Sequence, residues 1–338
     1  MKHFILLVAL AIGFSFPSNA QKKVHILNTP AGERTSFSRV FTDDEGKVYL
    51  SWVAQNPEKT LSTLYFAQLD EDGSTWQGAI SVVSGSNWFN NWADFPSVIK
   101  NKNLVTAHFL QKSGPGSYDY DVKLTFSSDN GLTWLTPFTA HNDGVTAEHG
   151  FVSMIPLDNG NTLVSWLDGR NTKASSGTDS HKDTDGHNNN HDNGHGHAGA
   201  MTLRAGEFTF AGAAVNRWQL DDRVCECCQT STALTAKGPA VVYRNRSTHE
   251  VRDIFITRSI DDVWTDPVPV HTDGWEIAGC PVNGPVIQAK NNNVAFAWFT
   301  GKDQIHQVKL ATSDESGFPD IAVVDNSVFV TWTNSEQC

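Results

Sequence analysis

Residues 160–167 read Gly-Asn-Thr-Leu-Val-Ser-Trp-Leu: a turn residue, then an alternating apolar strand that ends near an aromatic side chain. The same phrase recurs at residues 46–53, 102–110, 238–244, 292–299 and 326–333. Its aromatic residues are Trp52, Phe109, Trp166, Tyr243, Trp298 and Trp332. Six copies of one strand phrase, separated by further short strands, are typical of a β-propeller. The sequence therefore predicts an all-β, six-bladed β-propeller.

The intervals between these aromatic residues indicate one repeating unit. Successive spacings are 57, 57, 77, 55 and 34 residues. The long interval holds a polar insertion at residues 171–199, and the short one comes where the printed sequence ends. The last unit is thus incomplete, and we expect residues 23–28 to add a strand that closes the ring and covers its exposed edges.

The first twenty residues predict the compartment. Lys2 and His3 precede an almost unbroken apolar run at residues 4–16, and residues 18–20 are Ser-Asn-Ala. A positive start, a short apolar run and small residues are the pattern of a cleaved signal peptide. We expect cleavage after Ala20, which leaves one propeller domain at residues 21–338, exported to the periplasm or secreted. A retained membrane anchor is the alternative, and no cysteine follows the run to carry a lipid.

The charge balance limits the partners. Thirty-seven Asp and Glu outweigh 25 Lys and Arg, which gives a formal net charge of −12. Nucleic acids and anionic membranes attract basic patches, so neither is an expected partner. No other segment is long and apolar enough to insert into a membrane. A glycan or a metal ion remains as a partner, and we expect a monomer.

One turn sequence carries a family resemblance. Residues 127–134 read Ser-Ser-Asp-Asn-Gly-Leu-Thr-Trp, and weaker copies occur at residues 70–77, 259–265 and 313–319. In such a turn the Ser and Asp cap the backbone, the Gly permits a positive φ, and the Trp packs beneath the hairpin. The pattern resembles the Asp-box of sialidase-like BNR-repeat propellers. The residues that match it are Ser127, Asp129, Gly131, Thr133 and Trp134.

Three further motifs resemble an exported branch of the sialidase-like family. They lie at residues 224–232, 242–248 and 277–286 and contain Cys-Glu-Cys-Cys, Arg-Asn-Arg-Ser and Gly-Cys-Pro-Val-Asn-Gly-Pro. The resemblance implies a propeller of sialidase-like type in which the Asp-box turns lie between the third and fourth strands of their blades.

A sialidase adds a specific catalytic set to that fold. Three Arg hold the substrate carboxylate, a Tyr paired with a Glu attacks, and an Asp serves as acid and base. The resemblance implies that Arg39, Arg170 and Arg244 (with Arg246 as an alternative to Arg244) face the carboxylate and that Asp94 serves in acid/base catalysis. Arg39 departs from the family's Arg-Ile-Pro motif, because Val40 and Phe41 follow it. The sequence departs from the family late in the chain, where the last Arg is Arg258 and the last Tyr is Tyr243. We therefore expect an incomplete set, with surface ion pairs as the alternative role for each Arg.

The cysteines form the sharpest local signal. Cys225, Cys227 and Cys228 precede one predicted first strand, and Cys280 precedes the next. Such strand starts converge at one mouth of a propeller channel, where His149 is also expected. Thiolates and an imidazole at one mouth would bind copper(I) or zinc. The alternatives are a disulfide between Cys280 and either Cys225 or Cys228, and thiols that are inert or redox-active.

The insertion at residues 171–199 is rich in histidine, asparagine, aspartate and glycine. Its composition predicts a loop with no core of its own. Its imidazoles would collect zinc, copper or nickel, and a merely solvated loop is the alternative. The histidines are His181, His187, His191, His195 and His197.

Three functional interpretations follow. One is a glycan-directed protein, either an exo-α-sialidase or other glycoside hydrolase, or a glycan-binding propeller. The second is a metal-binding propeller of the cell envelope that uses the cysteines and His149. The third is a scaffold whose cysteines are structural. The missing late Tyr and Arg weaken hydrolysis, and the clustered cysteines favour the second interpretation.

Overall fold

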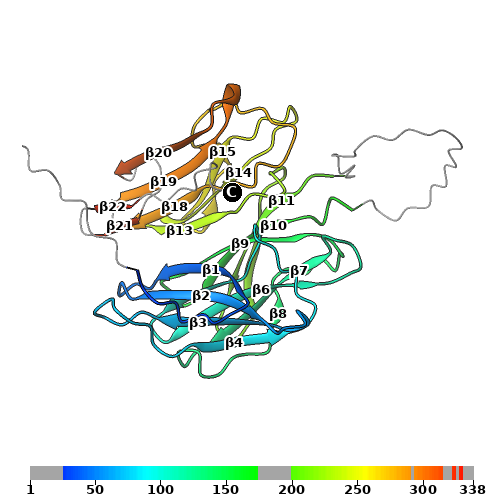
Figure 1. The fold of residues 1–338 in the computed structure, drawn as a ribbon. Helices are drawn as coiled ribbons and strands as arrows, with labels where there is room; N and C mark the ends of the chain where they lie inside the picture. The colour runs from blue at the N-terminus through cyan, green and yellow to red at the C-terminus, as the bar shows by residue number, and fades with distance from the viewer. Residues whose placement is uncertain (1–25, 174–198, 291–292, 315–321, 325–326, 330–338) are drawn as a thin grey trace, which may run out of the picture.

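The computed structural model describes residues 26–173, 199–290, 293–314, 322–324 and 327–329 (Figure 1). Nearly all of the regular structure in these ranges is antiparallel β-sheet, which confirms the all-β prediction. The predicted signal peptide, the five histidines of the insertion and Trp332 lie outside these ranges. Within them, no helix is long and apolar enough to cross a membrane.

Three four-stranded antiparallel sheets follow one another along the first two thirds of the chain. The first contains β1 (Thr35–Thr42), β2 (Val48–Gln55), β3 (Ser62–Gln68) and β4 (Ile80–Gly85). The second contains β5 (Ser97–Asn101), β6 (Leu104–Lys112), β7 (Tyr120–Ser127) and β8 (Phe138–Thr139). The third contains β9 (His149–Pro156), β10 (Thr162–Asp168), β11 (Thr202–Phe208) and β12 (Ala214–Asp221).

The fourth and later sheets are less regular. The fourth contains β13 (Ser231–Thr235), β14 (Gly238–Arg244), β15 (Ile254–Ile260), β16 (Val263–Trp264) and β17 (Val268–Pro269). The fifth contains β18 (Val286–Lys290), β19 (Asn293–Thr300) and β20 (Gln307–Asp314), with a 3-10 turn, η1 (Lys302–Gln304), before β20. The short strands β21 (Ala322–Val324) and β22 (Ser327–Phe329) pair with each other.

Each sheet follows the chain as a meander, and the repeated phrase forms its second strand: β2, β6, β10, β14 and β19. The first strands of neighbouring sheets touch in sequence order, β1 with β5, β5 with β9, β9 with β13 and β13 with β18. Figure 1 shows β13 beside β18. Sheets that meet through their first strands have the arrangement of propeller blades. Of the predicted closing strand, residues 26–28 are described, and they lie outside any strand with Ile26 exposed.

The core lies between neighbouring sheets rather than within one of them. Phe126 on β7 packs in one cluster with Met154 on β9 and Trp166 on β10, so this cluster joins the second and third sheets. The repeated aromatic is fully or almost fully buried in each described copy, at Trp52, Phe109, Trp166, Tyr243 and Trp298. The phrase that recurs in the sequence therefore supplies the contacts that hold the sheets together.

Hydroxyl groups connect the sheets near their first and second strands. Thr106 on β6 bonds Thr162 on β10 at 2.9 Å, and Ser165 on β10 bonds Thr232 on β13 at 3.0 Å. These buried hydroxyls satisfy one another and so help to position the third sheet against the second and the fourth.

The sequence that resembles an Asp-box, residues 127–134, forms the turn between β7 and β8. The hydroxyl of Ser127 accepts from the amide of Gly131 at 2.8 Å, and Asp129 accepts from the amide and the hydroxyl of Thr133 at 2.9 and 2.6 Å. Gly131 has a φ of +89°, and Trp134 donates to its carbonyl at 3.0 Å. The bonds from Thr133 lower the pKa of Asp129 to about 2. Residues 70–77 follow β3, and residues 259–265 run from the end of β15 through β16.

Candidate functional site

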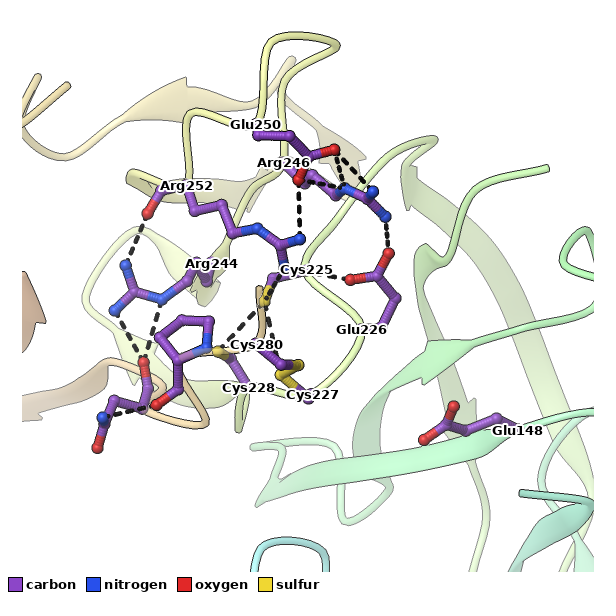
Figure 2. The surroundings of a disulfide bond; sticks show 12 residues. Glu148, Cys225, Glu226, Cys227, Cys228, Arg244, Arg246, Glu250, Arg252 and Cys280 are labelled. Atoms are coloured by element: carbon purple, nitrogen blue, oxygen red, sulfur yellow. Dashed lines mark hydrogen bonds and ion pairs between the residues drawn. A yellow bond between two sulfur atoms is a disulfide. The ribbon is translucent and has the colours of Figure 1, made fainter. Parts of the chain in front are cut away.

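The three motifs that carry the family resemblance meet in one place. Residues 225–228 lie in the connection between β12 and β13, and Cys280 lies in the connection between β17 and β18 (Figure 2). The amide of Cys225 donates to the carbonyl of Arg244, at the end of β14, at 2.9 Å. A Cβ on Gly284 would lie 2.1 Å from the carbonyl oxygen of Gln229. Only glycine permits this approach, so the two connections pack backbone to backbone.

Four sulfur atoms gather here, and we call Cys225, Cys227, Cys228 and Cys280 the cysteine cluster. Cys227 and Cys280 form a disulfide, with Cα atoms 6.1 Å apart and a sequence separation of 53 residues. A disulfide that includes Cys280 agrees with the sequence, but the pairing with Cys225 or Cys228 is wrong. Both of those side chains are buried and free, whereas Cys227 is half-buried and Cys280 is exposed.

The two free thiols form a close pair. The Sγ atoms of Cys225 and Cys228 are 3.3 Å apart, and that of Cys225 is 3.9 Å from the Sγ of Cys227. The hydrogen bond from Cys228 and the nearby guanidinium of Arg252 hold the pKa of Cys225 well below its usual range. Burial and the neighbouring sulfur of Cys225 raise the pKa of Cys228 well above the ordinary value of a thiol. The pair therefore favours a thiolate at Cys225 that accepts the S–H of Cys228.

Arg252 contacts that thiolate and is held there by a network of ion pairs. It donates from Nη1 to Cys225 Sγ at 3.1 Å, and it pairs with Glu226 at 3.2 Å and Glu250 at 2.9 Å. Arg246 also pairs with both glutamates (Figure 2). Arg252 is almost fully buried, and the two carboxylates fix its guanidinium in a position from which it donates to the sulfur of Cys225.

Arg244, predicted to face a substrate, is buried in the scaffold of the cysteine cluster. Its guanidinium donates to the carbonyls of Arg252 at 2.6 Å, Asn283 at 2.8 Å and Phe299 at 2.7 Å. It also stacks over Trp275, 5.0 Å from the ring centroid. The side chain is 1% exposed, and these contacts hold the loop that follows Cys280 against β14.

The predicted metal set is only partly assembled. The sulfurs of Cys225, Cys227 and Cys280 lie within 4.8 Å of one another, with Cys228 beside Cys225. His149 instead joins a separate group of imidazoles and carboxylates, which we call the histidine cluster. Its members are Asp121, His141, Asp143, His149 and Asp168.

The histidine cluster is held at the ends of β7, β9 and β10. The rings of His141 and His149 stack with centroids 3.6 Å apart and planes 7° apart. Asp143 Oδ2 lies 3.2 Å from His141 Nδ1 and 3.1 Å from His149 Nε2. Burial and the neighbouring His149 lower the pKa of His141. Burial also opposes a charge on His149, but its bond to Asp143 and the charge of Asp168 raise its pKa.

Arg170, the second predicted carboxylate ligand, already pairs with protein carboxylates. Its Nε and Nη2 donate to the two oxygens of Asp168, both at 2.7 Å, and Nη2 lies 2.9 Å from Asp143. Burial opposes the charge of Asp168, but the bidentate bond from Arg170 lowers its pKa. Arg39, on β1, is half-buried. The structure thus places the three arginines in three different environments.

Asp94, the predicted acid/base residue, meets two residues of the second and third sheets. Its Oδ2 lies 2.8 Å from the hydroxyl of Tyr120, which is also 3.0 Å from Glu148 Oε1. The amide of Phe151 donates to Asp94 Oδ1 at 2.8 Å. A Cβ on Gly150 would lie 1.9 Å from Asp94 Oδ2, so this position has room only for glycine. Gln229, directly after Cys228, donates to the carbonyl of Ala93.

The carboxylate pair, Asp94 and Glu148, titrates far from its ordinary range. Burial raises the pKa of Asp94 to about 7 and that of Glu148 to about 8. A hydroxyl has one proton to donate, so the second bond of Tyr120 is complete when that carboxyl is protonated. Trp92, two residues before Asp94, is 72% exposed. Carboxyls that hold a proton near neutral pH suit acid/base chemistry, and an exposed aromatic ring suits stacking on a ring-shaped ligand.

Sequence reasoning missed Arg252, Tyr120 and His141. Arg252 carries a signal, because it lies eight residues after Arg244 in the recognised arginine motif. Tyr120 and His141 carry none, because each comes from an ordinary strand or turn and gains its partners only when neighbouring sheets meet.

No protein-family model and no curated protein matches the chain. Among solved structures, it is similar to an α-L-arabinanase of Penicillium chrysogenum complexed with arabinobiose (TM-score 0.48, 10% identity, 82% of this chain and 76% of that one). It is also similar to a protein of unknown function from Dyadobacter fermentans (0.47, 14%, 84% and 80%). A third is a thermostable family-43 glycoside hydrolase (0.41, 10%, 91% and 96%). Because the scores and identities are low, we draw nothing about chemistry from them.

Proposed function

We propose that the cysteine cluster is a thiol–disulfide exchange site carried by an exported, monomeric, six-bladed propeller of sialidase-like type. One observation carries the proposal: a free thiol with a lowered pKa lies 3.9 Å from a disulfide sulfur. The lowered pKa keeps the thiol nucleophilic near neutral pH, and an oxidising compartment supplies disulfides as reaction partners.

The exchange runs inward from the surface in two steps. The Cys225 thiolate attacks Cys227 Sγ, and the bond between Cys227 and Cys280 breaks with its electron pair on Cys280. Cys228 then loses its proton to solvent and attacks Cys225, which forms a Cys225–Cys228 disulfide and releases Cys227 as a thiolate. These steps move the disulfide without net oxidation. A partner disulfide that reoxidises Cys227 and Cys280 is itself reduced to a dithiol.

Mapping of disulfides by mass spectrometry at set redox potentials tests the exchange. We expect wild-type protein to contain both the Cys227–Cys280 and the Cys225–Cys228 bond, and Cys228→Ser to stop at a Cys225–Cys227 bond. Cys338→Ser is the control and should behave as wild type. The proposal fails if Cys227–Cys280 is the only bond at every potential.

A second candidate is a soft-metal site, copper(I) or zinc, in the fully reduced cluster. The grouping of three sulfurs within 4.8 Å favours it, and the buried Nε of Arg252 has no hydrogen-bond partner among the described residues. A free buried donor suits the negative charge of a metal–thiolate complex. Metal analysis with thiol counting should find about one equivalent in reduced protein and none in Cys225→Ser. No binding after reduction rejects this candidate.

The carboxylate pair favours a third candidate, a glycan-directed site. Asp94 and Glu148 would act as acid and base, and Trp92 would stack on a sugar ring. Hydrolysis of aryl glycosides and calorimetry with glycans, comparing wild type with Glu148→Gln and Trp92→Ala, tests it. Turnover that is lost in Glu148→Gln supports hydrolysis, and binding that is lost only in Trp92→Ala supports a glycan-binding propeller. If the wild-type protein shows no turnover and no glycan binding, the candidate is rejected.

A further inference from the structure

His141 is a buried imidazole for which the described part of the chain offers no hydrogen-bond partner. It is 6% exposed, and neither its Nδ1 nor its Nε2 has a hydrogen bond among the described residues. The nearest polar atoms are Asp143 Oδ2 at 3.2 Å and Asp121 Oδ1 at 3.5 Å. A carboxylate oxygen only accepts hydrogen bonds, so it leaves the lone pair of a neutral imidazole unsatisfied. A buried polar atom in this state indicates a missing partner.

Backbone carbonyls fix the orientation of the neighbouring His149 ring. His149 Nδ1 lies 3.3 Å from the carbonyl oxygen of Tyr120 and 3.2 Å from that of Ala147, so this nitrogen carries the hydrogen. The lone pair of the neutral ring is then on Nε2, which faces Asp143 at 3.1 Å and Asp168 at 3.7 Å. A backbone carbonyl that fixes the tautomer of an imidazole is the usual outer support of a metal-bound histidine.

We propose that His141 and His149, together with the carboxylates of Asp121 and Asp143, bind a divalent transition-metal ion. Two imidazoles with carboxylates are the donor set that zinc and iron(II) sites use. Metal bonds of about 2.0–2.2 Å place neighbouring ligand atoms roughly 3.0–3.6 Å apart. One ligand atom each of Asp121, His141 and His149 lies within 4.8 Å of the other two. His141 Nε2 is 3.5 Å from Asp121 and His149 Nε2 is 3.1 Å from Asp143, which matches that spacing, whereas the other nitrogen of His141, Nδ1, lies 3.2 Å from Asp143.

The charges around the site leave two carboxylates, those of Asp121 and Asp143, for the ion. Arg170 binds Asp168 through two hydrogen bonds, which makes Asp168 an outer residue. Lys123 lies 3.2 Å from the other oxygen of Asp121. Arg204 donates to Gln219 at 2.5 Å and lies 3.9 Å from Asp168. Asp143 remains between the two imidazoles, with Arg170 at its edge. The ion would join β7, β9 and the connection after β8, and so link the second and third sheets.

This site is distinct from the cysteine cluster and does not rest on the proposed function. Its test therefore uses a background variant that removes other zinc ligands. This variant carries Cys225→Ser and Cys228→Ser and lacks residues 174–198. We expect calorimetry with zinc to give one site in this background. Cobalt(II) should show the visible absorption of a nitrogen and oxygen environment, and zinc should raise Tm.

The variants His141→Gln and Asp121→Asn should weaken zinc binding by at least about tenfold. Their control is His249→Gln, which removes an exposed imidazole outside the cluster and should leave affinity unchanged. If His141→Gln fails to fold, the milder Asp121→Asn variant decides the question. The proposal is overturned if the background protein binds no zinc, if both variants bind it as tightly as the background, or if magnesium competes equally.

Discussion

The cysteine cluster and the histidine cluster show two ways to build a buried reactive site from sheet connections. The cysteine cluster takes most of its residues from one short motif, and a buried arginine and a disulfide hold it. The histidine cluster collects single residues from β7, β9, β10 and the connection after β8. The first stabilises negative charge on sulfur, and the second surrounds two imidazoles with carboxylates. The sign of the local charge therefore decides which chemistry each site supports.

The largest expected effect is on the free energy of unfolding, and it compares an arginine beside each cluster. Arg244→Met should lower the free energy of unfolding by more than about 3 kcal/mol, because three buried carbonyls lose their donor. Urea unfolding measures the change, with the exposed Arg34→Met as a control expected to fall within about 0.5 kcal/mol. An equal effect of Arg170→Met would remove the contrast, since Arg170 is partly exposed.

The second prediction separates the arginine that touches sulfur from its neighbour. Arg252→Gln should slow exchange between Cys225 and Cys227 by about tenfold at pH 7, because the thiolate loses its charge partner. Arg246→Gln, which changes the same glutamates but contacts no sulfur, should leave the rate within about twofold. Acid quenching followed by mass spectrometry gives both rates. Equal slowing in the two variants would mean that the network acts only through folding.

The third prediction contrasts the pH dependence of the clusters, measured by urea unfolding with a chelator present. Cys225 has a lowered pKa, so its contribution to stability is present above the ordinary thiol value of about 8.5 and is lost as pH falls. His149 has a raised pKa, so its contribution is present below about 6.5 and is lost as pH rises. Between pH 6 and 9, the destabilisation should grow for Cys225→Ser and shrink for His149→Gln. Parallel curves would contradict the assignment.

The smallest expected effect concerns Lys123, which pairs with Asp121 at 3.2 Å. Lys123→Met should raise zinc affinity a few-fold, roughly 0.5–1 kcal/mol, because the Lys123 ammonium no longer competes with zinc for the carboxylate of Asp121. Calorimetry in the background without the other zinc ligands measures it. Weaker binding in this variant would show that Lys123 positions Asp121 rather than competing for it.

The sequence predicted the strands better than the sites. The repeated phrase marks the second strand of each of five sheets, because one buried face with one aromatic requires that pattern in each copy. The gathering of the four cysteines also followed from position, since Cys280 lies in the connection before β18 as Cys228 lies in that before β13. The disulfide partner did not follow, because side-chain direction within Cys-Glu-Cys-Cys depends on the packing of the loop.

The carboxylate pair and the histidine cluster needed the assembled sheets. Glu148 and His149 are adjacent in sequence, yet Glu148 bonds Tyr120 and His149 bonds Asp143. Neighbouring residues of a strand point to opposite faces, so one dipeptide serves two sites. The resemblance offered Asp94 as an acid/base residue, but only the contact between the second and third sheets brings Tyr120 against it.

Gln229 gives the cysteine cluster a mechanical connection to Asp94. Its side chain follows Cys228 directly and bonds the carbonyl of the residue before Asp94. If movement of the disulfide to Cys225 and Cys228 shifts this loop, the proton affinity of Asp94 changes with it. Thermodynamic linkage makes that coupling reciprocal, so the midpoint potential of the dithiol must then vary with pH near 7, where Asp94 titrates. Through Gln229, the redox state of the cysteine cluster and the protonation of Asp94 would thus influence each other.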